Sequence, residues 1–111
     1  MDVALMDGQI SMLANYIPGY FVNGKPDGPV GVGHPQLVPY QLFQTSDGFL
    51  VIACLTEQFW QRLCTLLGVE HLTVDPRFRT NADRVAHRDT LIPILEEIIR
   101  QRRSAELADA L

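Results

Sequence analysis

The sequence predicts an α+β fold, in which an N-terminal helix and a long loop precede an antiparallel β-hairpin and several further helices. Three observations support it: apolar residues recur at helical intervals near the start, Asp47-Gly48 separates two apolar runs, and helical spacing follows residue 56. We divide the 111 residues into a leading helix over 1–17, a linker loop over 18–39 and a small domain over 40–111.

The leading helix is indicated by one apolar stripe. Asp2 is a candidate N-cap, and Pro18-Gly19 is expected to end the helix. A regular stripe needs a surface to pack against, so we expect this segment to belong to a longer protein. The stripe consists of Val3, Met6, Ile10, Leu13 and Ile17.

Residues 18–39 hold five of the seven prolines and five of the eight glycines. Proline lacks an N–H and glycine is costly to order, so neither a helix nor a central strand is expected there. A loop of this length is typical of a functional or a disordered segment. His34 lies in it and is either a functional residue or a simple turn residue.

The hairpin is indicated by Ser46-Asp47-Gly48, which lies between the apolar runs 40–44 and 49–55. Thr56 is expected to cap the helix that follows, and Gly68 to end it. The residues of that helix expected to face inward are Phe59, Leu63, Leu66 and Leu67.

The remainder of the chain is predicted to be helical. Thr80 or Asn81 can cap a short helix through Ala86, Asp89 can cap the next, and Ser104 can cap the last. Apolar surface is therefore expected at both ends of the isolated chain, with self-association as the result. The second of these helices has one face formed by Leu91, Leu95, Ile98 and Arg102, and the last has Leu107 and Leu111 without a partner.

Composition restricts the classes of partner. Hydrophobic residues make up 47% and charged residues 20%, as in globular proteins, and the net charge of −4 disfavours nucleic acid. The longest apolar run, 49–55, is too short to cross a membrane. We expect no nucleic-acid, membrane or metal partner and a cytoplasmic location, with a mitochondrial one left open.

No residue type in the sequence by itself indicates a catalytic site. Cys54 and Cys64 lie among hydrophobic residues and are expected to be buried structural thiols. Asp2 and Asp7 are better explained by helix capping, and His71 and His87 by solvated positions. The arginines from residue 77 to residue 103 alternate with acidic residues, which predicts a solvated surface of ion pairs.

An ordered series of motifs covers the chain. It comprises GHPQLVPYQLF at 33–43, TSDGFLVIA at 45–53, LLG at 66–68, DPRF at 75–78, Asn81 and RVAHR at 84–88. This series resembles the class III CoA-transferases, the family of carnitine dehydratase and the bile-acid-inducible F protein. Residues 2–7 resemble the helix that leads out of the family's large domain. One departure is Val32, where family members commonly have asparagine.

The resemblance implies an enzyme that moves CoA from an acyl-CoA thioester to a free carboxylic acid. In the family an aspartate attacks the thioester, an acyl-aspartyl anhydride forms, and the CoA thiolate returns to give an aspartyl-CoA thioester. No position here matches that aspartate, so no catalytic residue is assigned. Coenzyme A enters as a thioester substrate, and no permanently bound cofactor is expected.

The glycine-rich loop resembles a segment that lies over the reactive centre in family members. The resemblance therefore assigns Gly31, Gly33 and His34 to a lid over the CoA-thioester site, where bare glycine N–H groups can approach a developing oxyanion. It also implies that the chain is an inactive fragment of an interlocked two-domain homodimer. Two alternatives remain: a fragment of an α-methylacyl-CoA racemase-type enzyme of the same family, and a non-catalytic interaction module.

Overall fold

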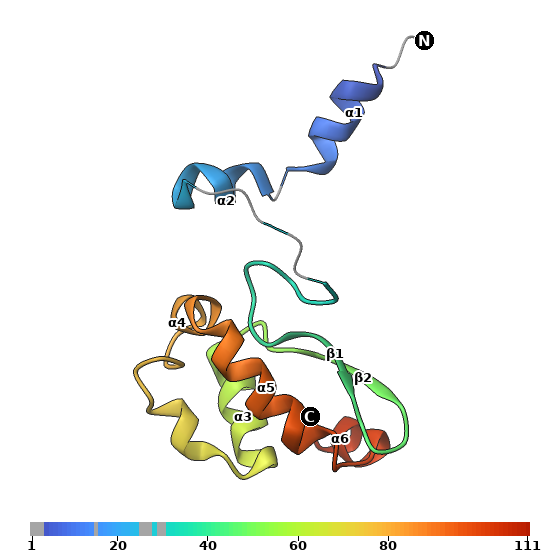
Figure 1. Cartoon of the computed structure of the whole chain (residues 1–111), viewed down its shortest axis with the longest axis vertical. Helices are drawn as coiled ribbons and strands as arrows, with labels where there is room; N and C mark the ends of the chain where they lie inside the picture. Colours follow the sequence, from blue (N-terminus) through green and yellow to red (C-terminus); the bar gives the residue numbers. More distant parts are fainter. Residues whose placement is uncertain (1–3, 15, 25–27, 29–30) are drawn as a thin grey trace. The chain divides into compact units, whose positions relative to one another are not determined.

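The computed structural model describes residues 4–14, 16–24, 28 and 31–111. It confirms the α+β fold, and the chain divides into two units, Met1–Val30 and Gly31–Leu111 (Figure 1). The elements of the first unit are α1 (Leu5–Met12) and α2 (Tyr16–Asn23). Those of the second are β1 (Tyr40–Gln44), β2 (Phe49–Ala53), α3 (Glu57–Leu67), the 3₁₀-helix η1 (Glu70–Thr73), α4 (Asn81–Ala86), α5 (Arg88–Ile99) and α6 (Ser104–Ala110).

The first unit contains two short helices where one longer helix and a loop were expected. Because α2 begins at Tyr16, Pro18 and Gly19 lie inside a helix and do not end one. Pro18 is in the first turn of α2, where backbone N–H groups lack a partner within the helix, so the missing proline N–H is tolerated. The expectation of an irregular loop beginning at Pro18 is therefore wrong as far as Asn23.

Most of the described apolar residues of the first unit are exposed, and Ile17 is partly buried. No residue of α1 is buried, and Met6 and Ile10 of the expected stripe are 71% and 50% exposed. Asp2 and Val3 lie outside the described residues, and the N-cap position of α1 is Ala4. Along the part of the chain that the structure describes, no helix has the length and apolar character needed to cross a bilayer.

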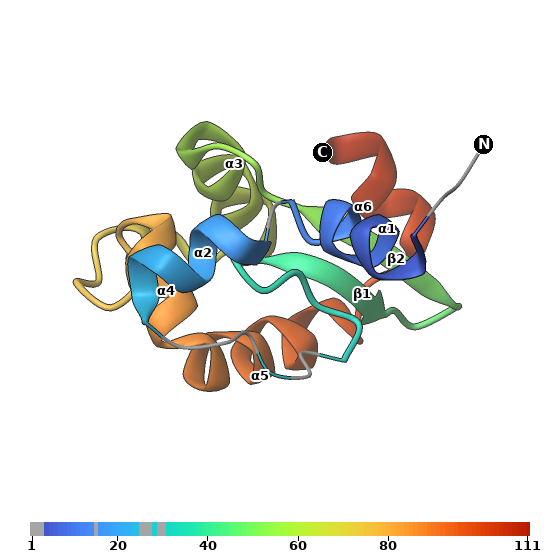
Figure 2. The ribbon, with the colours of Figure 1, turned by 90° about the horizontal axis from the view of Figure 1, so that it is seen from above.

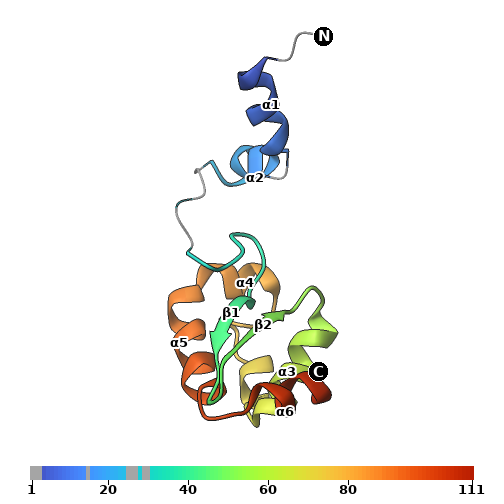
Figure 3. The ribbon, with the colours of Figure 1, turned by 90° about the vertical axis from the view of Figure 1, so that its right-hand side faces the viewer.

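The second unit is built around the predicted hairpin. β1 and β2 pair antiparallel with Phe43 opposite Leu50 and Gln44 opposite Phe49. Figures 2 and 3 show the two strands between α5 and α3. Thr56 accepts a hydrogen bond from Phe59 N, and Gly68 ends α3 with a left-handed φ of 72°, so both predicted ends of α3 are confirmed.

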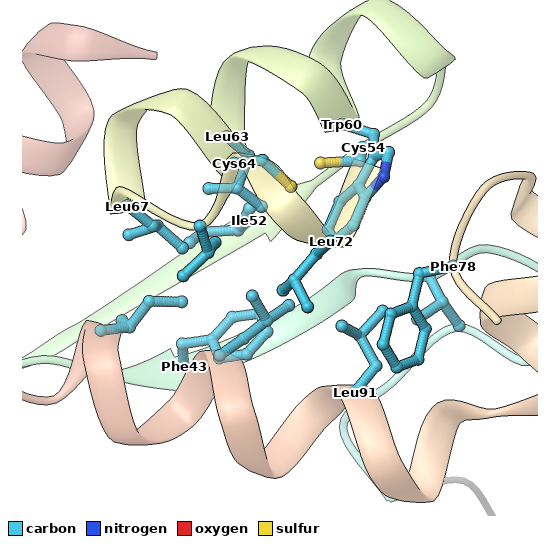
Figure 4. Close-up of a cluster of buried hydrophobic side chains, with 14 of the residues drawn as sticks. Phe43, Ile52, Cys54, Trp60, Leu63, Cys64, Leu67, Leu72, Phe78 and Leu91 are labelled. Atoms are coloured by element: carbon cyan, nitrogen blue, oxygen red, sulfur yellow. The ribbon is translucent and has the colours of Figure 1, made fainter. Parts of the chain in front are cut away.

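One hydrophobic core joins the hairpin to the helices. Figure 4 shows side chains from the hairpin, α3 and α5 that point toward one another. Phe59 was expected to face this core but is 43% exposed, and Trp60 is buried instead. The helical repeat explains the difference, because residue 60 is three, four and seven positions from the other buried residues of α3. Those residues are Leu63, Cys64 and Leu67.

The helix ends of the C-terminal half differ from expectation in two places. Thr80 caps α4 as predicted, in a reciprocal arrangement with Asp83. Asp89 is not a cap, because α5 begins at Arg88 and places it in the first turn. Ser104 is likewise the first residue of α6, and the N-cap position is Arg103.

The predicted apolar face of α5 is partly correct. Leu91 and Leu95 are buried, the third buried residue of this helix is Ile99, and Ile98 is partly buried against the core. Arg102 was expected on the same face, but α5 ends at Ile99 and leaves it outside the helix.

The C-terminal helix is part of the core, contrary to the expectation that its apolar residues lack partners. Leu107 is fully buried, and Leu111 packs against the core cluster. Helix α6 contacts β2, so the two residues find their partners within this unit. The error arose because the packing of a short helix against a distant strand has no local signature in the sequence.

The hairpin turn is bonded to the start of α6. Ser104 N donates to Asp47 Oδ1 over 2.8 Å, and the Thr45 and Ser104 hydroxyl oxygens are 2.7 Å apart. Ser46 N donates to the Arg102 carbonyl over 2.9 Å. The backbone and side-chain hydrogen bonds from Ser104 lower the pKa of Asp47 from 3.8 to about 2. The turn carboxylate thus holds two distant segments together.

Protonation of Asp47 should lower the free energy of unfolding in acid. Its pKa is lower in the folded chain, so its stabilising effect is present above pH 3.8 and is lost as the pH falls toward about 2. Asp47→Asn should therefore be less stable than the wild type at neutral pH and equally stable near pH 2. Urea unfolding of both proteins across this range measures the difference, and two parallel pH profiles would contradict the assignment.

Leu107 should contribute to stability far more than an exposed leucine. Leu107→Ala removes a fully buried side chain and is expected to lower the free energy of unfolding by about 2–5 kcal/mol. Leu55→Ala is the matched control, because Leu55 is 59% exposed. Both values come from urea denaturation, and equal losses would show that α6 does not pack as described.

Candidate functional site

The three candidate residues lie where the chain turns back along β1. Gly33 forms an isolated antiparallel bridge with Gln41, and His34 N donates to the Tyr40 carbonyl over 2.8 Å. Gly31 is exposed and has a φ of 62°, a left-handed conformation in which a side chain would be strained. Gly33 and His34 are thus fixed beside the strand, whereas Gly31 lies on the surface.

The side chain of His34 is held by its neighbours. Its ring stacks on the Tyr40 ring, with centroids 5.3 Å apart and planes inclined by 8°. Its Nδ1 accepts a hydrogen bond from Gln36 N over 3.1 Å. The residue is half-buried, and the Tyr40 ring covers one face of the imidazole.

Two side chains from the helical region bind the backbone of this loop. The amide of Asn81 bonds to it twice, since Nδ2 donates to the Gln36 carbonyl over 2.8 Å and Oδ1 accepts from Val38 N over 3.0 Å. Arg88 donates to the carbonyls of His34 and Pro35. The loop backbone therefore has partners 43 and more residues further along the chain.

A third side chain, Arg84, is buried under the end of the loop. It is 1% exposed, and its Nε donates to the Val38 carbonyl over 2.7 Å. One Nη donates to the Phe78 carbonyl over 3.2 Å, and the guanidinium pairs with both carboxylate oxygens of Glu57. These hydrogen bonds lower the pKa of Glu57. The guanidinium also lies 4.9 Å from the centre of the Trp60 ring.

Sequence reasoning missed these three helical residues. The prediction of a solvated surface of ion pairs is confirmed for Arg77 and Arg102, which pair with nearby carboxylates. It is wrong for Arg84, which is buried. The available signal was the loop itself, whose backbone groups needed partners, together with the polar residues 81, 84 and 88 near the junction of two helices.

The two thiols are not reactive nucleophiles at neutral pH. Burial raises the pKa of Cys54 to about 11 and of Cys64 to about 12, so both thiols are protonated at neutral pH. The prediction of buried structural cysteines is confirmed. His71 and His87 are exposed, as expected. Within the described ranges, no group of three or more His, Cys, Asp and Glu side chains is suited to hold a metal ion.

A cleft lies between the glycine-rich loop, the hairpin and the C-terminal end of α5. Its volume is about 220 Å³, and its largely apolar walls include a carboxylate from α5 and the guanidinium of the residue that follows this helix. Val32 of the glycine-rich loop contributes to the wall. The other lining residues are Leu42, Gln44, Phe49, Glu96 and Arg100.

Removal of the Arg84 guanidinium should destabilise the second unit strongly. Arg84→Met leaves the Val38 and Phe78 carbonyls without these donors and is expected to lower the free energy of unfolding by about 2–5 kcal/mol. Glu57→Gln is the milder comparison, with an expected loss of about 1–3 kcal/mol, because it removes the counter-charge of the buried guanidinium but keeps one amide oxygen that can accept from it. Urea denaturation gives both values, and a larger loss for Glu57→Gln would reverse the assignment.

Comparison with known proteins identifies relatives of this sequence. The chain is 40% identical over 88 residues to a succinate–glutarate CoA-transferase of Agrobacterium fabrum, covering 79% of this chain and 22% of that protein. It is 32% identical over 111 residues to an acetyl-CoA:oxalate CoA-transferase of Acetobacter aceti, covering 100% of this chain and 28% of that protein.

The fold is also similar to a solved structure. A CaiB/BaiF family protein from Brucella suis superimposes with a TM-score of 0.71 and 40% sequence identity, covering 99% of this chain and 29% of that one. The chain therefore spans less than a third of the length of these relatives. The sequence model of CoA-transferase family III matches residues 1–111, and the chain belongs to that family.

Proposed function

We propose that this chain is part of an acyl-CoA transferase that moves CoA from an acyl-CoA thioester to a free carboxylic acid, and that it is inactive alone. Membership of CoA-transferase family III is the observation that carries the proposal. The two curated relatives are named as transferases, which favours this branch over the racemase-type alternative. The specific acyl donor and acid acceptor are not part of the proposal.

In the proposed reaction the thioester C–S bond of the donor breaks and a C–O bond forms at the donor acyl carbon. At the acceptor one C–O bond of the carboxylate breaks, and a new C–S bond joins CoA to that carbon. The donor acyl group leaves as a carboxylate, so the exchange needs no oxidant, reductant or metal. The chain's thiols are buried and protonated, and we assign it no nucleophile. Its role is to contact the substrate while a nucleophilic aspartate lies elsewhere in the complete enzyme.

Within this role, we assign Gly31, Gly33 and His34 to a lid over the thioester. The support is local: two of them lie beside β1, and side chains of α4 and α5 hold the following backbone in place. A loop fixed in this way can present N–H groups to an oxygen without reorganising during the reaction. Residues 1–17 are then assigned to the large domain, 18–39 to the linker and lid, and 40–111 to part of the small domain.

The complete enzyme is proposed to be a cytoplasmic homodimer. The exposed apolar residues of α1 and α2 support an additional covering surface, which the interlocked dimers of the family would supply. The two free buried cysteines support a reducing compartment.

A chimera tests the proposed function. The aligned 88 residues of the Agrobacterium fabrum transferase are replaced by the matching residues of this chain, and glutaryl-CoA formed from succinyl-CoA and glutarate is measured by mass spectrometry. We expect kcat/KM within about tenfold of the parent, a difference of about 1.4 kcal/mol in barrier. The isolated 111-residue chain should form no product.

Three outcomes contradict the proposal. A chimera that folds by circular dichroism but transfers no CoA would exclude the transferase role. Inversion of a stereocentre beside the thioester, without CoA transfer, would favour the racemase-type alternative. Turnover by the isolated chain would show that it is not an inactive fragment.

A further inference from the structure

Three of the four hydrogen-bonding groups of His34 have a hydrogen-bond partner. Its backbone N–H donates to the Tyr40 carbonyl, its carbonyl accepts from Arg88, and its Nδ1 accepts from Gln36 N. Throughout the described part of the chain, no hydrogen bond to Nε2 is found. The stack on Tyr40 fixes the plane of the ring, so the orientation of Nε2 is set as well.

These contacts determine which ring nitrogen carries the hydrogen. A backbone N–H can only donate, so Nδ1 of His34 must be the unprotonated nitrogen. In a neutral imidazole the other nitrogen is then the donor. A hydrogen on Nδ1 would point at the Gln36 N–H, so this arrangement favours the tautomer with its hydrogen on Nε2.

From this geometry we infer that His34 is a substrate-binding residue, which donates a hydrogen bond from Nε2 to an acyl oxygen of the substrate. The inference rests on the proposed function, since acyl oxygens are present on both substrates of a CoA-transferase: the thioester carbonyl and the carboxylate of the acid. Both accept hydrogen bonds and neither donates when the acid is ionised, so a fixed donor matches either one.

Arg88 acts in this scheme as a positioning residue. It touches the backbone on both sides of the His34–Pro35 peptide bond and so holds the ring's attachment point without reaching the substrate itself. Tyr40 has the same function for the ring plane. Because these contacts exist before substrate arrives, little side-chain freedom remains to be lost on binding.

The tautomer can be measured directly on the 111-residue chain. Two-dimensional ¹H–¹⁵N spectra of the imidazole rings distinguish a protonated, pyrrole-type nitrogen from an unprotonated, pyridine-type one. At mildly alkaline pH we expect pyrrole-type Nε2 and pyridine-type Nδ1 for His34, with its signals assigned by their loss in His34→Asn. A pyrrole-type Nδ1, or an equal mixture of both tautomers, overturns the inference.

Two substitutions in the active chimera test the contact with substrate. Glutamine places its amide group where Nε2 lies in histidine, whereas asparagine reaches only as far as Nδ1. We expect His34→Asn to lower kcat/KM by about ten- to a hundredfold, as for a lost hydrogen bond to a charged or polarised oxygen, and His34→Gln to retain most of the activity. His71→Asn is the control, because His71 is exposed and outside the loop.

The kinetic constants of His34→Asn distinguish whether His34 contacts the thioester carbonyl or the carboxylate of the acid. A higher KM for glutarate indicates the acid carboxylate, and a lower kcat with unchanged KM indicates the oxyanion formed from the thioester. Equal loss in both His34 variants, or no loss in His34→Asn, overturns the inference while the proposed function stands. If the unsubstituted chimera is inactive, the proposed function fails, and the assignment of His34 to a substrate fails with it.

Discussion

The buried guanidinium of Arg84 is the interaction on which the second unit depends. It joins the end of the glycine-rich loop, at the Val38 carbonyl, to the segment before α4, at the Phe78 carbonyl, and to Glu57 at the start of α3. A charge in this position is costly unless each of its donors has a partner, and here the carbonyls and the carboxylate provide them. The three segments are distant in sequence, and this one side chain holds them together. It therefore also helps to position the loop that carries His34.

Local chemistry was sufficient to predict the hairpin and both ends of α3. An Asp-Gly turn, a threonine N-cap and a glycine C-cap each act within a few residues, so the sequence shows them directly. Pro18 was misjudged because a proline that usually ends a helix is also accepted in a first turn. The burial of Leu107 was missed because its helix, α6, packs against β2, a strand more than fifty residues earlier.

In the candidate site, too, the sequence indicated the loop residues but not their partners from distant parts of the chain. Composition and family resemblance led to His34 and the neighbouring glycines, but not to Asn81 and Arg88, which bind the loop backbone. These two belong to a helical region rich in charges, where a solvated surface is the usual outcome. A proline-rich loop has backbone carbonyls and N–H groups that need hydrogen-bond partners from elsewhere in the chain. A search for those partners would have pointed to Asn81 and Arg88.

The bond between the hairpin turn and α6 has a consequence for biosynthesis. Asp47 and its partner Ser104 are separated by 57 positions, so a ribosome exposes the strands well before it makes the residues that secure them. During that interval the hairpin has few neighbours, and its unpaired edges are available to other nascent chains. Assembly of this unit is therefore completed from its C-terminal side, and a premature stop before residue 104 would release a polypeptide whose hairpin turn lacks its bonds to α6.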